Sequence, residues 1–178
     1  MRIIGGAWRS RLLIVPQAPG LRPTPDRVRE TLFNWLGQDL TGRFCLDLFA
    51  GSGALGFEAA SRGASQVVMV EASGRAYAGL KANAVALGAT QVELHRGDGI
   101  EFLARDARRF DVVFLDPPYK SRYWTRLLPL LPARLAPGAL VYVESAEPFD
   151  PGQGWEVWRQ HRAGQVCYRL LKRQGGSP

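Results

Sequence analysis

The sequence has few of the residues that build disulfide frameworks and metal sites. Its 178 residues include two cysteines, Cys45 and Cys167, and each lies inside an apolar, strand-like stretch. The two histidines, His95 and His161, are far apart and show no metal-ligand spacing. Two buried thiols make no disulfide scaffold and no zinc set, and we expect no metal site.

Long apolar runs are also missing. The chain has no run of about 18 apolar residues, the length that a membrane helix needs. The opening residues, MRIIGGAWRS, lack the apolar core of a signal peptide. We therefore expect a cytoplasmic protein with no membrane partner. Hydrophobic residues make up 46% of the chain and charged residues 22%, which is typical of a globular protein of one domain, with or without a small appendage.

Lysine is scarce although the chain is basic. Lys and Arg number 23 against 16 Asp and Glu, a net charge of +7, and the lysines are only Lys81, Lys120 and Lys172. A basic surface attracts polyanions, and nucleic acid is the partner we expect. Arginine suits bidentate phosphate contacts and stacking on bases. The simpler interpretation is that the charge keeps the protein soluble, and the arginine bias is equally typical of a GC-rich or heat-adapted genome.

The order of apolar runs predicts an α/β fold. From Gly42 onward strand-like and helix-like segments alternate, which indicates a Rossmann-like sheet that is mostly parallel with helices on both faces. Residues 154–173 are typical of an antiparallel hairpin around Ala163-Gly164. The helix expected over residues 123–136 contains two prolines that should interrupt or bend it.

The first forty residues differ from the rest. We predict an N-terminal basic extension, residues 1–40, attached to a main domain of residues 41–178. Residues 2–15 hold two short apolar runs around Gly5-Gly6, typical of a small hairpin. A helix should follow, with Thr24 as its N-cap and Pro25 as its first residue.

A glycine pattern follows the first strand of the main domain. Gly51, Gly53 and Gly56 form G-x-G-x-x-G in DLFAGSGALG, between a predicted strand and a predicted helix. Such glycines allow a tight turn and a close ligand approach. Glu71 ends the next strand, where an acid can accept hydrogen bonds from ribose hydroxyls. The pattern favours a nucleoside-bearing cofactor; the alternative is an ordinary turn with Glu71 merely solvated.

Two aspartates help to choose the cofactor, since NAD and S-adenosylmethionine both fit a glycine loop. Asp47 precedes the glycines, where its carboxylate would repel a diphosphate but attract a sulfonium with an α-amino group. Asp98, after the third strand, is placed to accept a hydrogen bond from an adenine amino group. Asp98 also fits the N-cap of the next helix, and both roles are compatible.

The strand FDVVFL leads into the motif DPPY, Asp116 to Tyr119. With the glycine loop, this motif resembles class I S-adenosylmethionine-dependent methyltransferases that modify exocyclic amino groups. The stretches RIIGGAWRSRLL and RPTPDRVRETLFNWL narrow the resemblance to the RsmD-type bacterial methyltransferases, which methylate N2 of a guanine in 16S rRNA, expected to be guanine 966. The resemblance covers almost the whole chain.

The resemblance implies S-adenosylmethionine as cofactor and 16S rRNA, or the assembling small subunit, as partner. DPPY alone is less specific, because adenine- and glutamine-modifying enzymes carry relatives of it. A DNA or RNA adenine-N6 methyltransferase is therefore the alternative, and an NAD-linked oxidoreductase is supported only by the glycine pattern. The expected cofactor-binding residues are Asp47, Phe49, Gly51, Gly53, Glu71 and Asp98.

DPPY suits the methylation of an aryl amine. The lone pair of such an amine is delocalised, and acceptors placed against its two N–H groups favour the pyramidal, nucleophilic form. The Asp116 carboxylate and the Pro117 carbonyl are the expected acceptors, and the two prolines hold them in place. The Tyr119 ring can stack on the target base, worth about 1–3 kcal/mol. The alternative is a stiff loop with Tyr119 in the core.

A guanine in a duplex must be flipped out or unpaired to reach such a site. We expect the basic N-terminus and the segment after DPPY to hold the surrounding RNA, in a protein that acts as a monomer. Trp8, close to Arg9 and Arg11, can stack on a base or pack on the domain. The candidate RNA-binding residues are Arg2, Trp8, Arg9, Arg11, Arg22, Lys120 and Arg122.

Overall fold

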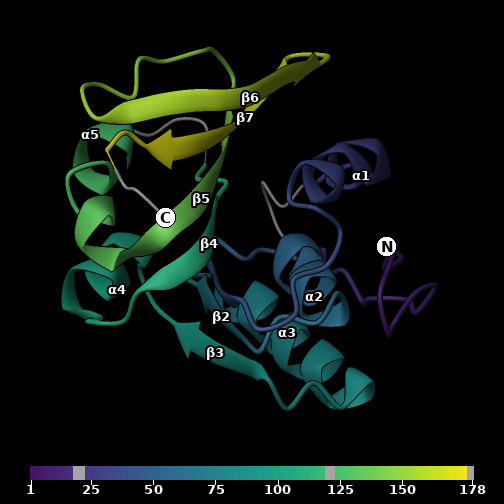
Figure 1. Ribbon diagram of the computed structural model, residues 1–178. Helices are drawn as coiled ribbons and strands as arrows, with labels where there is room; N and C mark the ends of the chain where they lie inside the picture. The colour runs from purple at the N-terminus through teal and green to yellow at the C-terminus, as the bar shows by residue number, and fades with distance from the viewer. Residues whose placement is uncertain (18–22, 119–122, 176–178) are drawn as a thin grey trace.

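The computed structural model describes residues 1–17, 23–118 and 123–175 (Figure 1). A seven-stranded sheet has the order β3-β2-β1-β4-β5-β7-β6. Its strands are β1 (Phe44–Asp47), β2 (Gln66–Glu71), β3 (Val92–Arg96), β4 (Phe110–Leu115), β5 (Leu135–Ser145), β6 (Trp155–Ala163) and β7 (Val166–Arg173). The first five pair in parallel, and β7 pairs antiparallel with both β5 and β6. The predicted Rossmann-like architecture is confirmed, with the turn of the final hairpin at residues 164–165, one position later than expected.

Helices cover both faces of the sheet. On one face lie α1 (Asp26–Trp35), α2 (Ala54–Ser61) and α3 (Gly74–Leu87); on the other lie α4 (Gly99–Arg105), α5 (Tyr123–Leu127) and a 3-10 helix (Leu131–Arg134). The predicted interruption at the two prolines is confirmed, because α5 ends before Pro129 and the 3-10 helix contains Pro132.

The central strands are apolar because both of their faces are covered. Along β4, Val112 and Phe114 face the α1 side, while Val113 and Leu115 face the α4 side, and all four are buried. A parallel sheet covered on both sides gives this continuous apolar pattern. The two cysteines are buried and unpaired, as predicted.

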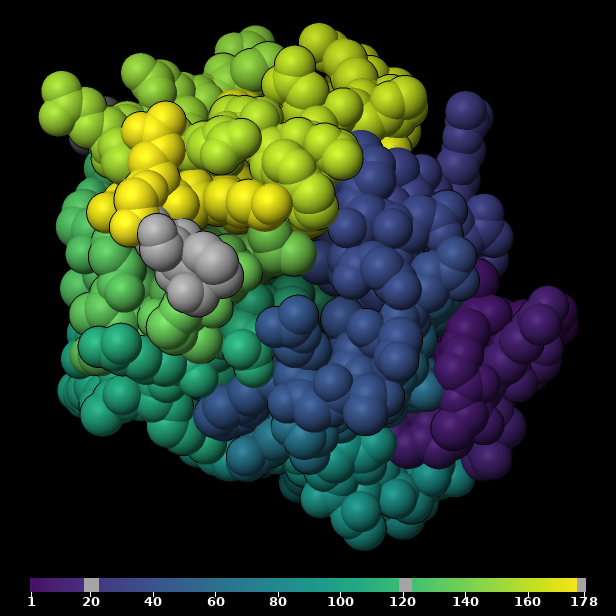
Figure 2. Space-filling view, viewed as in Figure 1, coloured from purple at the N-terminus to yellow at the C-terminus, as the bar shows by residue number. Residues whose placement is uncertain are grey.

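The N-terminal residues share the core of the α1 face. Ile3 and Leu13 are buried in the same cluster as Leu32 of α1 and Phe114 of β4. Two segments of this N-terminal stretch meet at an antiparallel bridge between Arg2 and Leu12, a minimal form of the expected hairpin. Figure 2 shows these residues in purple against the blue and teal surface of the main fold.

Glu58, on α2, is the residue that fastens the N-terminus. One carboxylate oxygen accepts the backbone N–H of Ile4 (2.9 Å) and a guanidinium N–H of Arg29 (3.2 Å). The other accepts the N–H of Gly5 (2.8 Å) and the Nε–H of Arg62 (2.9 Å). Arg29 and Glu58 are both 0% exposed. A buried carboxylate that is fully bonded in this way fixes α1 and the N-terminal residues on α2.

The start of α1 differs from the prediction. The helix begins at Asp26, Pro25 occupies the N-cap position, and no side chain caps it. The Thr24 hydroxyl instead donates to the Glu144 carboxylate of β5 (3.3 Å). A tertiary partner therefore takes the hydroxyl that sequence reasoning assigned to the helix.

We expect Glu58→Ala to lower the free energy of unfolding by about 3–5 kcal/mol. The change removes the buried carboxylate partner of Arg29, which keeps only Asp26, and it leaves the N–H groups of Ile4 and Gly5 without their acceptor. Urea denaturation measures the change. Glu30→Ala, at an exposed position of α1, is the control and should cost less than about 0.5 kcal/mol. Equal losses in the two variants would show that the buried pair does not carry the attachment.

Candidate functional site

The glycine loop lies at the carboxyl end of β1, where parallel strands of this architecture bind ligands. Gly51 and Gly53 have φ values of 54° and 80°, which favour glycine. A Cβ on Gly53 would lie 2.5 Å from the Phe57 ring, and one on Gly56 would lie 2.5 Å from Met69. The glycines therefore serve both the turn and the close packing of α2 on the sheet.

Glu71 holds this loop in shape. Its carboxylate accepts the N–H of Gly51 (2.7 Å) with one oxygen and the N–H of Ser73 (2.7 Å) with the other. The interpretation of Glu71 as a merely solvated acid is therefore wrong. Its expected contact with ribose hydroxyls stays a prediction, which this half-buried position at the loop supports.

Asp47 is a carboxylate inside the protein. It is 2% exposed and accepts the N–H of Gly56 (3.0 Å). Burial is the main cause that raises the pKa of Asp47 to about 7, and the Glu71 and Glu144 carboxylates raise it further. A buried acid with acidic neighbours is stabilised by a cation. Asp47 and its acidic neighbours therefore fit a ligand that places a cationic group at the carboxyl end of β1.

Asp98 caps α4, as one of its two predicted roles required. Its carboxylate accepts the N–H groups of Ile100 (2.9 Å) and Glu101 (3.0 Å). A cavity of about 380 Å³ opens beside it, with Val70 and Phe102 among its lining residues. This volume is within the usual range for small-molecule sites, so the expected adenine contact of Asp98 has space in the structure.

The motif after β4 lies beside Asp47. Asp47 pairs with Phe114, and Asp116 follows two positions later on the same face. Pro117 is buried and Asp116 is half-buried. Phe49, in the glycine loop, packs edge-on against Tyr123 at 5.2 Å between ring centroids. Tyr119, the predicted stacking residue, lies outside the described residues.

Glu144 is a third acid at this edge, and the sequence reasoning missed it. Glu144 follows Val143, the partner of Leu115, just as Asp116 follows Leu115, so the two acids are neighbours on adjacent strands. Glu144 is 5% exposed and accepts the hydroxyls of Tyr142 (2.8 Å) and Thr24 (3.3 Å). The sequence signal that could have identified Glu144 is an acid at the end of the apolar strand ALVYVES.

The three acids influence one another. Burial raises the pKa of Asp116 well above its usual range, and the charges of Glu144 and Asp47 raise it further. Burial also raises the pKa of Glu144, against the effect of the hydrogen bonds from Tyr142 and Thr24. Acids this close do not all ionise readily. The site therefore favours protons or cations between the ends of β1, β4 and β5.

The N-terminal RNA candidates lie at the other end of α2 from the glycine loop. The N–H of Trp8 donates to the hydroxyl of Ser61, the last residue of α2, and Arg11 donates to the carbonyl of Ala86 near the end of α3. Arg2 and Arg9 are exposed, whereas Trp8 is half-buried and packs against the core. The packing alternative for Trp8 is thus realised. Arg22, Lys120 and Arg122 lie outside the described residues.

Known proteins resemble this chain over nearly its full length. A family model described as "Conserved hypothetical protein 95" matches residues 1–172. The ribosomal RNA small subunit methyltransferase D of Escherichia coli (strain K12) is 44% identical over 180 residues, covering 98% of this chain and 90% of the relative. The protein of the same name from Haemophilus influenzae is 42% identical, covering 97% and 93%.

Solved structures agree with the fold. An Escherichia coli protein with a provisional methyltransferase name superposes with a TM-score of 0.89 at 43% identity, covering 97% of each chain. A ribosomal protein L11 methylase from Lactobacillus delbrueckii has a TM-score of 0.68 at 19% identity, covering 95% of this chain and 89% of its own. The second likeness shows the fold alone.

We expect the stability of the ligand-free protein to fall as the pH rises from about 4 to about 7. The folded pKa values of Asp47, Asp116 and Glu144 are raised, so the folded state binds protons more tightly than the unfolded chain. This stabilisation is complete below the unfolded pKa near 4 and is lost as the pH passes the folded values.

Glu144→Gln should make the free energy of unfolding fall less as the pH rises, because it removes one charge from the three-acid cluster. Urea unfolding at pH 5 and pH 8 measures it, with Glu147→Gln at an exposed position as the control. A pH dependence equal to that of the wild type would mean that the Glu144 charge does not interact with Asp47 and Asp116.

Proposed function

This chain belongs to the RsmD family of ribosomal RNA small subunit methyltransferases, and we propose that it transfers a methyl group from S-adenosylmethionine to N2 of a guanine in 16S rRNA. The observation that carries the proposal is that Asp116 and Pro117 directly follow β4, the strand that pairs with β1 at Asp47. A site for an amine thus adjoins a site for a cation. Guanine 966 is the nucleotide that the family likeness suggests.

The residues around the glycine loop fit S-adenosylmethionine. When bound, it supplies an electrophilic methyl group on a sulfonium. Asp47 would face its positively charged part, and the raised pKa of Asp47 in the free protein supports this role because a nearby cation would favour the carboxylate. Glu71 would bind the ribose, and Asp98 would bind the adenine beside the cavity. Phe49, Gly51 and Gly53 complete the proposed cofactor site.

Asp116 and the Pro117 carbonyl would accept the two N–H groups of the target amine. Because Pro117 has a fixed φ and is buried, these acceptors need little ordering when the base arrives. Methyl transfer gives a cationic nitrogen, which the Asp116 carboxylate stabilises electrostatically. The nitrogen then loses one proton to Asp116 or to water, leaving a neutral methylamino group. Tyr119 would stack on the flipped base.

The RNA would approach from the side of α1. Residues 1–40 are, in this proposal, the RNA-contacting extension, and residues 41–178 are the catalytic part. Arg2, Arg9 and Arg11 would contact phosphates at the far end of α2. Arg22, Lys120 and Arg122 are further proposed RNA contacts and lie outside the described residues. The substrate is 16S rRNA or the assembling small subunit, and the enzyme is expected to act in the cytoplasm as a monomer. None of the described helices is long and apolar enough to cross a membrane.

One experiment tests the proposed function directly. The protein is incubated with labelled S-adenosylmethionine and 16S rRNA from cells that lack the enzyme, and the modified nucleotide is mapped by mass spectrometry. We expect a single N2-methylguanine. Methylation of adenine, or NADH binding without S-adenosylmethionine binding, would overturn the proposal.

We expect Asp116→Ala to abolish methyl transfer and to leave cofactor affinity within a few fold of wild type, because the carboxylate addresses the target amine. Calorimetric titration with S-adenosylhomocysteine and single-turnover transfer assays measure the two effects. Equal losses of transfer and of affinity would assign the motif to cofactor binding instead.

Reversing Arg2, Arg9 and Arg11 to Glu should weaken RNA binding and flatten its dependence on salt, because fewer counterions are released. Fluorescence anisotropy at several salt concentrations gives the slope. An unchanged slope would remove the N-terminal residues from the RNA contact.

A further inference from the structure

The β6–β7 hairpin reaches the catalytic edge of the sheet. Because β7 is antiparallel to both neighbours, β6 runs in the same direction as β5, and its end lies at the edge where Asp116 lies. Glu144 pairs with Tyr168, and Tyr168 pairs with His161. One row across the strands therefore leads from Asp116 through Glu144 and Tyr168 to His161.

This row brings β6 within reach of the nucleotides beside the target. Neighbouring strands are about 4.8 Å apart, so three strand spacings separate Asp116 from His161 by roughly 15 Å. Successive phosphates of one strand in a duplex lie about 3.4 Å apart along its axis, so roughly 15 Å corresponds to about four of them. A base held at Asp116 would thus have nucleotides within about four positions of it on β6.

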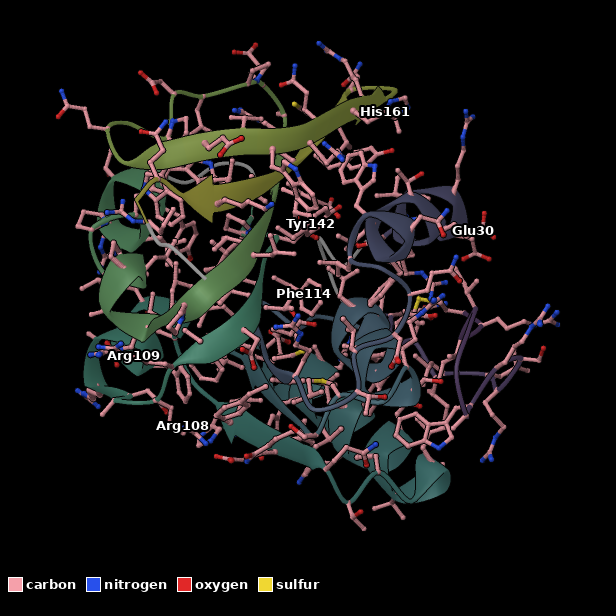
Figure 3. The ribbon with its side chains drawn as sticks, in the orientation of Figure 1. Glu30, Arg108, Arg109, Phe114, Tyr142 and His161 are labelled. Atoms are coloured by element: carbon pink, nitrogen blue, oxygen red, sulfur yellow. The ribbon has the colours of Figure 1, made fainter. Side chains whose placement is uncertain are left out.

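The side chains of this part of β6 point to the catalytic face. His161 meets the edge of the Tyr168 ring at 5.5 Å between centroids, and Tyr168 packs against Tyr142, the donor to Glu144. Arg159 pairs with Leu170, which belongs to the core cluster of the α1 side. Arg159 and His161 therefore share a face with Tyr142, Glu144 and α1, and Figure 3 shows His161 above α1.

Cations and an aromatic ring lie together on this face. Residues 155–173 contain five Arg and Lys and one acid, Glu156, and two of the cations, Arg159 and Lys172, lie against Trp158. The Arg159 guanidinium lies 4.4 Å from the Trp158 ring centroid, and Lys172 lies 3.4 Å from the same ring. In the ion pairs found among the described residues, four arginines bind carboxylates, and Arg159 is not among them.

The arrangement is open to a ligand. Arg159, Gln160 and His161 are exposed, and β6 ends the described strand order, with a neighbour on one side only. Among the described residues, the Arg159 side chain donates one hydrogen bond, from Nη1 to the carbonyl of Trp158 (3.1 Å). An exposed guanidinium beside an exposed imidazole suits a phosphate and a stacked base.

We propose that the β6 surface formed by Arg159 and His161 binds the rRNA strand that flanks the target nucleotide, with Arg159 on a phosphate and His161 against a base. The inference rests on the proposed function for the identity of the nucleic acid. Arg159 and His161 would thus contact RNA at the same edge of the sheet as Asp116, whereas the N-terminal arginines lie at the opposite end of α2.

Two variants test the surface. Arg159→Gln should raise the Kd for 16S rRNA fragments containing the target about tenfold at 0.1 M salt and lower the salt slope by about 0.7, the value for one phosphate contact on a single strand. His161→Ala should raise the Kd at least about fivefold. In both, the KM for RNA should rise while the affinity for S-adenosylhomocysteine stays at the wild-type value, which also verifies folding.

Matched controls are available in the same chain. Arg109→Gln removes the same charge at an exposed position before β4, at the opposite end of the sheet from His161 in Figure 3. Gln160→Ala alters an exposed residue of β6 that pairs with Arg169, on the other face. Both controls should bind RNA like the wild type.

Wild-type Kd and salt slope in Arg159→Gln and His161→Ala would overturn the inference. Normal binding of naked RNA with weaker binding of the assembling subunit would also overturn it, because the surface would then contact a protein. The outcome is separate from the proposed function: if the wild type binds RNA through this surface but forms no N2-methylguanine, the surface stands and the proposed function fails.

Discussion

Three carboxylates at the ends of adjacent strands, the buried Asp47 and Glu144 and the half-buried Asp116, constrain this structure more than any other feature. Burying an acid is unfavourable unless a hydrogen bond, a proton or a cation compensates for the lost hydration. Asp47 accepts the backbone N–H of Gly56, and Glu144 accepts the hydroxyls of Tyr142 and Thr24. Positive charge would stabilise these acids further, and both a sulfonium methyl donor and a newly methylated amine carry it.

The N-terminal residues take part in this arrangement through another buried acid, Glu58. Glu58 binds Arg29 of α1 and the backbone of Ile4 and Gly5, so α1 is held against α2. That position brings Thr24, just before α1, to Glu144. Residues before α1 are therefore connected by hydrogen bonds to acids on α2 and at the carboxyl end of β5.

Local sequence patterns were sufficient to predict much of the local structure around the site. The glycine loop, the cap at Asp98 and the interruption of the helix at its prolines depend on residues that are close in sequence, where φ preferences and hydrogen bonds within a few residues decide. Thr24 was misassigned because its hydroxyl has two possible partners. The distant acid, 120 positions along the chain, binds it instead of the helix end.

The sequence by itself determined the alternation of strands and helices, the glycine turn and the stiff end of β4, because each follows from periodicity or from the backbone limits of Gly and Pro. Only the tertiary structure decided which residues surround Asp116. Strand order and register placed Glu144 beside it and His161 on the same row, and these neighbours come from segments with no pattern in common. Pairing between strands is a contact between distant parts of the chain, so a reading of local sequence does not contain it.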